Sequence, residues 1–555
     1  MDTADLLNTT TTPPQHVDLA KQSLLSSPLY ISLIGGVLAI TLYDIWYRNT
    51  DAFKKLRTIP GPPILPVIGN AHLLVGVTPT ELVQKALGYM KQYGETISGC
   101  FFNIRLVFLT NPADVEIILN SSVHLEKSVE YKFFQPWFGD GLLISKGDHW
   151  RHHRKMIAPT FHQSILKSFV PTFVKHSQNV ANRLEARFLG QEFDVHSHMS
   201  QTTVEILLST AMGMKKLPEG KECVRYADAV VEMCDIIQKR QTKPHYHFDP
   251  IYRWTKLRQK CDNMMNIILN LTRNVVAQRR ENFNLETDSV LDQQDALNEK
   301  AGKKAEGLRD DLDIIDEERD VGAKRRLALL DAMVEMTKNP NIEWTEKDVM
   351  DEVNTIMFEG HDTTSAGSSF VLCLLGIHKD VQARVFEEQK EIFADDLQRE
   401  CTFADTLEMQ YLERVIKETL RLYPPVPVIG RKVNEDVPLA SGPYVIPKGT
   451  TVILGQYAVH RRPDCYENPE KFDPDNFLPE KMAKRHYYSY IPFSAGPRSC
   501  VGRKYAMLML KVLLSTLVRK FHIHSNVDES QFNLQGDIIL KLANGFKIVL
   551  TPREA

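Results

Sequence analysis

The chain has 555 residues, of which 43% are hydrophobic and 25% charged, and its formal net charge is -3 at pH 7. This composition is typical of a soluble globular body and excludes a disordered, collagen-like or polytopic membrane chain. The near-neutral charge argues against nucleic-acid binding, which a basic domain would indicate. The eight cysteines include no Cys-x-x-Cys pair, so they predict neither a zinc site nor a disulfide framework.

An uncharged, largely apolar segment near the N-terminus precedes the basic residues Arg48, Lys54, Lys55 and Arg57. About 20 apolar residues cross a bilayer as a helix. A signal peptide is the alternative, but its leading region would be basic and its apolar core shorter. We therefore expect a lumenal segment at 1–28 and a retained transmembrane anchor at 29–47. By the positive-inside rule, the rest of the chain lies on the cytosolic side.

Residues 48–69 begin basic and become proline-rich, ending in Ile59-Pro-Gly-Pro-Pro-Ile-Leu-Pro-Val-Ile-Gly69. Proline fixes φ and removes a backbone donor, so this run predicts a stiff, extended connector that is neither a helix nor a central strand. We expect it to orient the following body, residues 70–555, against the membrane.

Helical periodicity dominates this body, with short strand-like pieces at 104–109, 444–446 and 451–454, which predicts a mainly α fold with a small β region. An acidic insertion at 281–324 interrupts the pattern. Residues Glu281–Asp320 hold 14 acidic and 5 basic side chains, a net charge of -9. Such a segment buries too little apolar surface to offset its ordering entropy, so we expect it to be exposed and mostly disordered.

The strongest chemical signal is a glycine-rich loop around one cysteine, Phe493-Ser-Ala-Gly-Pro-Arg-Ser-Cys-Val-Gly502. Glycine allows the backbone to approach a flat cofactor, so Cys500 can present its thiolate to a metal there. Arg498 adds positive charge near that thiolate or near an anionic substituent. A helix is expected after Gly502, and its N-terminal dipole favours the thiolate. An ordinary buried cysteine is the alternative, which the fixed spacing of Phe493, Arg498 and Gly502 disfavours.

This loop resembles the haem-binding loop of the cytochromes P450, Phe-x-x-Gly-x-Arg-x-Cys-x-Gly, at every fixed position. The resemblance implies the P450 fold for residues 70–555, with Cys500 as the axial thiolate ligand of a haem b. It also implies that Phe493, Arg498 and Gly502 belong to the cofactor site.

A second motif, Glu359-Gly-His-Asp-Thr-Thr364, lies in a helical pattern that starts near Thr345. Glu359, Asp362 and Thr363 are spaced to share one helix face, beside a turn that Gly360 would loosen. A solvated polar face is the alternative. The motif looks like the P450 oxygen-activation motif, which implies that Asp362 and Thr363 organise proton delivery.

Glu359 replaces the small residue usual in that motif. The replacement is similar to that in the family 4 P450s, whose glutamate can form an ester with a haem methyl group. The resemblance therefore implies a haem that can be covalently linked through Glu359, and an unlinked acid is the alternative.

Two further motifs match the family's haem-propionate contacts. Trp150 and Arg154 lie one helical turn apart in Trp150-Arg-His-His-Arg154, and Arg431 follows Pro-Pro-Val-Pro-Val-Ile-Gly. The resemblance implies that Arg154 and Arg431 meet the propionates. His152 and His153 are interpreted as ordinary surface histidines.

Glu418-Thr-Leu-Arg421 matches the family's Glu-x-x-Arg motif, which is structural. Glu418 and Arg421 share a helix face and can pair, and a surface ion pair is the alternative. The family's third, charged partner is replaced here by Asn476, which can hydrogen-bond but carries no charge.

No nucleotide-binding glycine fingerprint occurs in the chain, so electrons must come from a partner. The resemblance names NADPH–cytochrome P450 reductase and O2, and it places the protein in the endoplasmic reticulum membrane with its catalytic domain cytosolic. We expect the reductase at a basic face near Lys155, Arg503 and Lys504.

At a finer level, the acidic insertion, Phe138-Gly-Asp-Gly-Leu-Leu-Ile and the stretch from Asn354 to Thr364 resemble the insect G subfamily of family 4. That resemblance implies oxidative decarbonylation of long-chain fatty aldehydes to cuticular hydrocarbons. Fatty-acid ω-hydroxylation is one alternative, and a non-catalytic haem-binding or sensor protein is another. Asp362 and Thr363 argue against the sensor, because ligand binding alone needs no proton relay.

Overall fold

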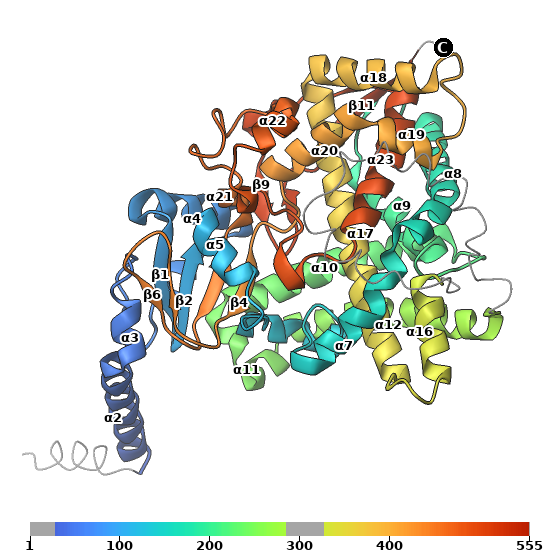
Figure 1. Cartoon of the computed structure of the whole chain (residues 1–555). Coiled ribbons are helices and arrows are strands. Elements are labelled where there is room, and N and C mark those ends of the chain that lie inside the picture. The colour runs from blue at the N-terminus through green and yellow to red at the C-terminus, as the bar shows by residue number, and fades with distance from the viewer. Residues whose placement is uncertain (1–27, 285–326, 554–555) are drawn as a thin grey trace, which may run out of the picture.

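The structure, a computed structural model, describes residues 28–284 and 327–553. All but the last residue of the lumenal segment expected at 1–28 lies outside the described residues. So does most of the acidic insertion, whose first two residues belong to helix α12 (Lys256–Asn282). The described body is mainly helical, and its largest sheet, which includes β1, β2 and β4, lies on the side that carries α2 (Figure 1). This agrees with the fold class that the sequence predicts.

The expected anchor is part of helix α2 (Pro28–Asn49), which projects from the body in Figure 1. Its stretch Tyr30–Asn49 has a mean hydropathy of 1.4 and only 6% of it is buried, so its length and composition are those of a membrane-spanning helix.

The last turn of α2 is fastened to the proline-rich connector. Arg48 pairs with Asp44 and donates a 2.6 Å hydrogen bond to the carbonyl oxygen of Leu65. Asp44 also accepts a hydrogen bond from the backbone N–H of Val67, at 3.0 Å. Tyr47 is buried and donates to the carbonyl oxygen of Asn103. The connector is irregular, as predicted, and holds the end of α2 against the body.

Helix α17 (Glu346–Ile377) runs through the centre of the body and packs against α9, α20 and α23 (Figure 1). Thr345 and Asp348 form the predicted capping box at its start. The other α-helices in the described residues are α3 (Asp51–Leu56), α4 (Pro79–Tyr93), α5 (Pro112–Leu119), α6 (Gln135–Phe138), α7 (Gly147–Ile157), α8 (Gln163–Phe188), α9 (His196–Ser209), α10 (Gly220–Thr242), α11 (Asp249–Arg253), α16 (Leu329–Lys338), α18 (Lys379–Phe393), α19 (Phe403–Glu408), α20 (Gln410–Leu422), α21 (Gln456–Val459), α22 (Pro479–Met482) and α23 (Arg503–Lys520).

The largest sheet has the strand order β1-β2-β7-β4. The β2–β7 pair is parallel, and the β1–β2 and β7–β4 pairs are antiparallel. The strands are β1 (Thr96–Phe101), β2 (Ile104–Leu109), β3 (Glu192–Asp194), β4 (Ile429–Lys432), β5 (Val437–Pro438), β6 (Val445–Ile446), β7 (Thr451–Leu454), β8 (Phe521–His524), β9 (Leu534–Gly536), β10 (Leu540–Leu542) and β11 (Lys547–Pro552). The three strand-like pieces predicted from the sequence correspond to β2, β6 and β7.

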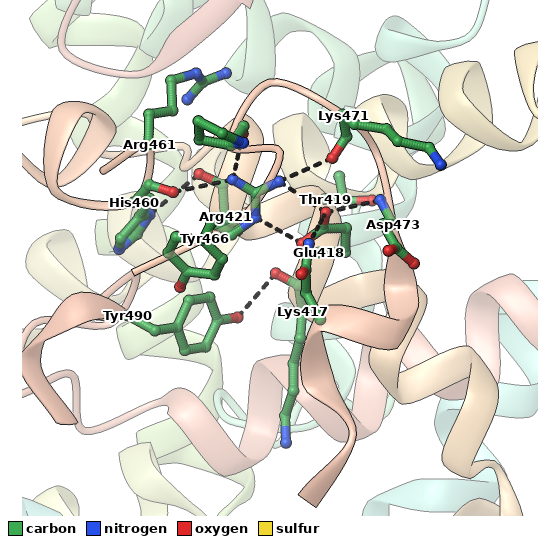
Figure 2. Close-up of polar contacts among 12 residues, drawn as sticks. Lys417, Glu418, Thr419, Arg421, His460, Arg461, Tyr466, Lys471, Asp473 and Tyr490 are labelled. Carbon is green, nitrogen blue, oxygen red and sulfur yellow. Dashed lines mark hydrogen bonds and ion pairs between the residues drawn. The ribbon is translucent and has the colours of Figure 1, made fainter. Parts of the chain in front are cut away.

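A fully buried ion pair on α20 holds the segment that follows the sheet. The Arg421 guanidinium donates to both carboxylate oxygens of Glu418, at 2.7 and 2.8 Å, and neither side chain is exposed (Figure 2). Arg421 also donates to the carbonyl oxygens of His460, Pro469 and Lys471. The pair is therefore a buried connector of several chain segments, and the surface alternative is wrong.

Asn476 takes the place that the sequence assigns to it. Its side-chain amide donates to Glu418 Oε1 at 3.1 Å, and the backbone N–H of Asp473 donates to the same oxygen at 2.8 Å. The carboxylate is thus satisfied by one charged partner and two neutral donors, which explains how the site works without a second cation.

Replacing Arg421 by Ala should destabilise the fold by about 3–5 kcal/mol, because Glu418 would remain buried without its counter-charge. Urea unfolding followed by circular dichroism measures the change. The matched control is Arg258→Ala, which removes an exposed pair with Asp262 and should cost less than about 1 kcal/mol. Equal losses in the two variants would contradict this assignment.

Candidate active site

Segments far apart in the sequence enclose an internal cavity of about 480 Å³. It lies between α7, α17, the start of α23 and the cysteine loop before α23. Most of the residues predicted for the cofactor and catalytic site line it, namely Trp150, Arg154, Glu359, Thr363, Phe493, Arg498, Cys500 and Gly502. The fold therefore brings together motifs that lie more than 300 residues apart.

The cysteine loop is a tight hairpin that turns Cys500 toward this cavity. The backbone N–H of Cys500 donates to the carbonyl oxygen of Phe493 at 2.9 Å. Ser494 and Gly496 adopt positive φ angles of 60° and 67°, and a methyl group on Gly496 would meet the carbonyl oxygen of Leu119 at 2.0 Å. Glycine at 496 is therefore required by the close approach of two backbones.

Burial raises the pKa of the Cys500 thiol to about 11, and the nearby carboxyl of Glu359 adds to the rise. The backbone N–H of Gly502 and the charges of Arg154 and Arg503 act in the opposite direction. The protein alone therefore favours the neutral thiol, and a metal ion would be needed to hold the thiolate at neutral pH.

Buried cations gather around this end of the cavity. Arg498 lies over the Trp150 ring at 4.3 Å and donates to the carbonyl oxygens of Leu125, Leu142 and Ser145. Burial, together with Arg431 and Arg154, lowers the pKa of Arg498 to about 9.

Lys127 and Arg431 complete the cation cluster. Burial and the charges of Arg431 and Arg498 lower the pKa of Lys127 well below its ordinary value. Arg431 is 1% exposed and does not line the cavity directly, and its Nη2 has no hydrogen-bond partner in the described part of the chain.

The cation cluster fits a dianionic cofactor. Lys127, Arg431 and Arg498 are buried together beside the cavity, which Arg154 also lines, and the Glu359 carboxyl is close enough for its charge to act on Lys127 and Arg498. Uncompensated buried charge is costly, and the unpartnered Arg431 nitrogen needs an acceptor. The two propionates of haem b would supply both, with a cysteine positioned to ligate the iron.

Glu359 and Thr363 both face the cavity from α17. The Thr363 hydroxyl donates to the carbonyl oxygen of Glu359 at 2.5 Å. Burial raises the pKa of Glu359 to about 7, so the carboxyl exchanges its proton near neutral pH. The Glu359 carboxyl can hold or release a proton at the cavity wall, and the Thr363 oxygen can accept a hydrogen bond from a water there.

Gly360 does not loosen the helix, contrary to the sequence prediction. α17 is continuous through it. A methyl group added at Gly360 would meet Leu207 of α9 at 2.9 Å, so the glycine permits close packing of the two helices.

Asp362 faces away from the cavity, so the prediction that it shares one face with Glu359 and Thr363 is wrong. Gly360, Thr363 and Thr364, which also line the cavity, lie on one side of Glu359 around the helix axis, and Asp362 lies on the other side. Its buried carboxylate instead pairs with Lys541 of β10 at 3.0 Å. Although burial opposes ionisation, Lys541 keeps the pKa of Asp362 below its ordinary value.

The surface interpretation of His153 is also wrong. The ring is 2% exposed, and its Nδ1 lies 2.6 Å from a carboxylate oxygen of Glu352 on α17. The residues around His153 in the sequence are polar. They give no sign of its partner Glu352, which lies 199 residues further along the chain.

A family model described as cytochrome P450 matches residues 59–550. The chain is also 64% identical, over 95% of both chains, to cytochrome P450 4g1 of Drosophila melanogaster. The chain is a cytochrome P450. It is 44% identical to cytochrome P450 4g15 of the same insect, over 96% of this chain and 99% of the relative. It is 34% identical to human cytochrome P450 4V2, over 95% of each chain. These relatives place this P450 in family 4 and in the insect G subfamily.

Two residues of this P450 site could not be found from sequence. Lys127 and Lys541 belong to none of the motifs, and each reaches its partners only through the folded arrangement of distant segments. Lys541 stands in the apolar run Ile-Ile-Leu-Lys-Leu-Ala, which is a weak signal of a buried lysine, whereas the polar surroundings of Lys127 carry no such signal.

Lys541→Met should destabilise the P450 by about 3–5 kcal/mol, because Asp362 would lose its buried counter-charge. The double variant Lys541→Met with Asp362→Asn should recover much of that loss. Thermal unfolding of the holoenzyme measures both. The control is Lys547→Met, which removes a half-exposed lysine 3.9 Å from Glu192. A Lys541→Met variant as stable as this control would contradict the assignment.

Proposed function

We propose that this P450 oxidatively decarbonylates long-chain fatty aldehydes to hydrocarbons, the activity that its resemblance to the G subfamily implies. The observation that carries the proposal is the 64% identity over 95% of the chain to a member of that subfamily. At the coarser level, the chain is a family 4 P450 monooxygenase, an enzyme class that uses haem, O2 and electrons from a reductase.

The cavity wall supports an aliphatic substrate. Away from Cys500, apolar side chains of α4 and of the segment between β9 and β10 line the cavity, including Leu82, Val83, Leu87, Ile538 and Ile539. Such a wall binds a hydrocarbon chain by removing apolar surface from water.

The surroundings of the anchor support access from the bilayer. Phe248, Ile251 and Trp254, in and beside α11, are exposed. Phe248 also contacts Phe102, in the hairpin between β1 and β2 that receives the end of α2. We propose that this apolar surface lies on the endoplasmic reticulum membrane beside the anchor, with the catalytic domain on the cytosolic side.

In the proposed mechanism, haem bound to Cys500 supplies the oxygen chemistry. Arg154, Arg431 and Arg498, together with Lys127, would hold the propionates of the bound haem. The Thr363 hydroxyl donates to the Glu359 carbonyl oxygen at the cavity wall, which leaves its oxygen free to accept a hydrogen bond from a water and so position that water for proton transfer. Asp362 does not line the cavity. Its ion pair with Lys541 would hold this turn of α17, and with it Thr363, in position.

Electrons would reach the site from NADPH–cytochrome P450 reductase. Arg503 begins α23 directly after the cysteine loop, next to Lys504, and Lys155 is exposed on α7. We propose that these basic residues meet the acidic reductase, with their charges steering the encounter.

Reductase-supported turnover of a long-chain aldehyde should release a hydrocarbon one carbon shorter, detected by gas chromatography. The control is Cys500→Ala, which should lose both the product and the thiolate-type Soret band of the carbon monoxide complex. An ω-hydroxylated product without any hydrocarbon would support the fatty-acid hydroxylase instead.

Thr363→Ala should uncouple oxygen consumption from product, because the hydroxyl that positions the proton-delivering water is lost. Hydrocarbon formed per NADPH should fall by about tenfold to a hundredfold while peroxide rises. Thr355→Ala serves as the control, since Thr355 makes the same kind of hydrogen bond within α17, to Asp351, but does not line the cavity. Unchanged coupling in Thr363→Ala would remove the residue from the mechanism.

Glu359 should become esterified to a haem methyl group during turnover. The ester replaces a C–H bond of the methyl by a C–O bond, a two-electron oxidation that the O2 and electrons of turnover supply. Acid extraction and mass spectrometry should leave haem on the wild-type protein and none on Glu359→Ala. The control Glu130→Ala removes another carboxylate of the cavity and should retain linked haem. Complete extraction from the wild type would refute the linkage.

A further inference from the structure

Outside the haem cavity, two histidines of α7 and one aspartate of α17 converge. One ring nitrogen of His149, one of His153 and a carboxylate oxygen of Asp348 all lie within 4.8 Å of one another. His149 and His153 are four residues apart on one helix, so their rings share a face, and the ring centroids are 3.9 Å apart. Asp348 approaches from the first turn of the neighbouring helix.

The atoms of His153 and Asp348 are spaced as two ligands of one metal ion would be. His153 Nε2 lies 3.9 Å from Asp348 Oδ1, too far for a hydrogen bond. Ligands at about 2.0–2.1 Å from a tetrahedral Zn²⁺ lie roughly 3.4 Å from each other, close to this separation. The other oxygen of Asp348 is already committed, since it accepts hydrogen bonds from the backbone and side chain of Thr345. Oδ1 is the oxygen left for a ligand.

The surroundings of His153 fix the nitrogen that faces this gap. Its Nδ1 lies 2.6 Å from Glu352 Oε1, and the other oxygen of Glu352 accepts from the backbone N–H of Leu142. Trp344 stacks on the ring at 4.2 Å. When Nδ1–H donates its hydrogen bond to this carboxylate, Nε2 keeps its lone pair for a metal ion, the arrangement that supports metal-bound histidines.

We propose that His149, His153 and Asp348 bind a divalent first-row metal ion, for which Zn²⁺ is the best match. Two imidazoles and one carboxylate are a nitrogen and oxygen set that zinc accepts, with water as the fourth ligand. His149 is exposed, so the ion can enter from solvent. Glu352 would not bind the ion itself but would orient the His153 ring through its hydrogen bond to Nδ1.

A metal ion here would join the two helices that carry the haem site. Trp150 and Arg154 directly follow His149 and His153 on α7, about 100° further around the helix, and α17 holds Glu359 and Thr363. A bound ion would tie the first turns of α17 to α7 beside the cofactor. Metal binding should therefore raise the thermal stability of the holoenzyme.

The test uses the full-length holoenzyme without a histidine tag, stripped with a chelator and dialysed against buffered Zn²⁺. Elemental analysis should find one zinc per haem in the wild type. His149→Ala should bind at least about tenfold more weakly, and Glu352→Gln about tenfold to a hundredfold more weakly. His152→Ala is the matched control, because His152 is on the same helix but outside the cluster, and it should bind as the wild type does.

X-ray absorption and thermal unfolding identify the site independently. The zinc of the wild type should have only nitrogen and oxygen neighbours, near 2.0–2.1 Å. Its addition should raise the unfolding midpoint of the wild type and of His152→Ala but not that of His149→Ala. The carbon monoxide spectrum should be the same in all variants, which shows that they fold. Zinc with a sulfur neighbour, no stoichiometric zinc in the wild type, or His149→Ala binding as tightly as the wild type would each overturn the proposal.

Discussion

Polar side chains buried along α17 determine where the neighbouring segments must lie. A buried polar group without a partner costs free energy, so each one selects a specific contact. Glu352 takes His153 from α7 and the backbone of Leu142, and Asp362 takes Lys541 from β10. The helix therefore specifies the arrangement of the surrounding layers through its polar groups as well as through its apolar packing.

The same helix explains what the sequence could and could not predict. Its capping box, its length and the positions of Glu359 and Thr363 follow from local spacing, and so do the cysteine loop and the Glu418–Arg421 pair. The direction of Asp362 does not, because it depends on Lys541, which lies 179 residues further along the chain. The prediction that Gly360 loosens the helix is wrong for a similar reason, because its neighbour Leu207 comes from a separate helix.

The cation cluster is a second feature that local sequence patterns do not predict. Arg154, Arg431 and Arg498 each belong to a motif, but their combined charge becomes a constraint only when Lys127 joins them in a buried space. Burial lowers the pKa of Arg431 and of Arg498, which shows that their charged forms are held there at a free-energy cost. Cofactor binding and folding are therefore thermodynamically linked, and the apoprotein should be the less stable form.

The fastening of α2 to the connector has a consequence for how this P450 meets its partners. Arg48 and Asp44 join the last turn of α2 to the backbone at Leu65 and Val67, so the body is not carried on a loose tether. If α2 spans a bilayer, these contacts would restrict rotation of the body about its anchor, and diffusion in the bilayer plane would present a restricted set of faces to a partner. Because docking of two specific surfaces is slowed mainly by their need to find the right orientation, a fixed tilt would raise the share of productive collisions.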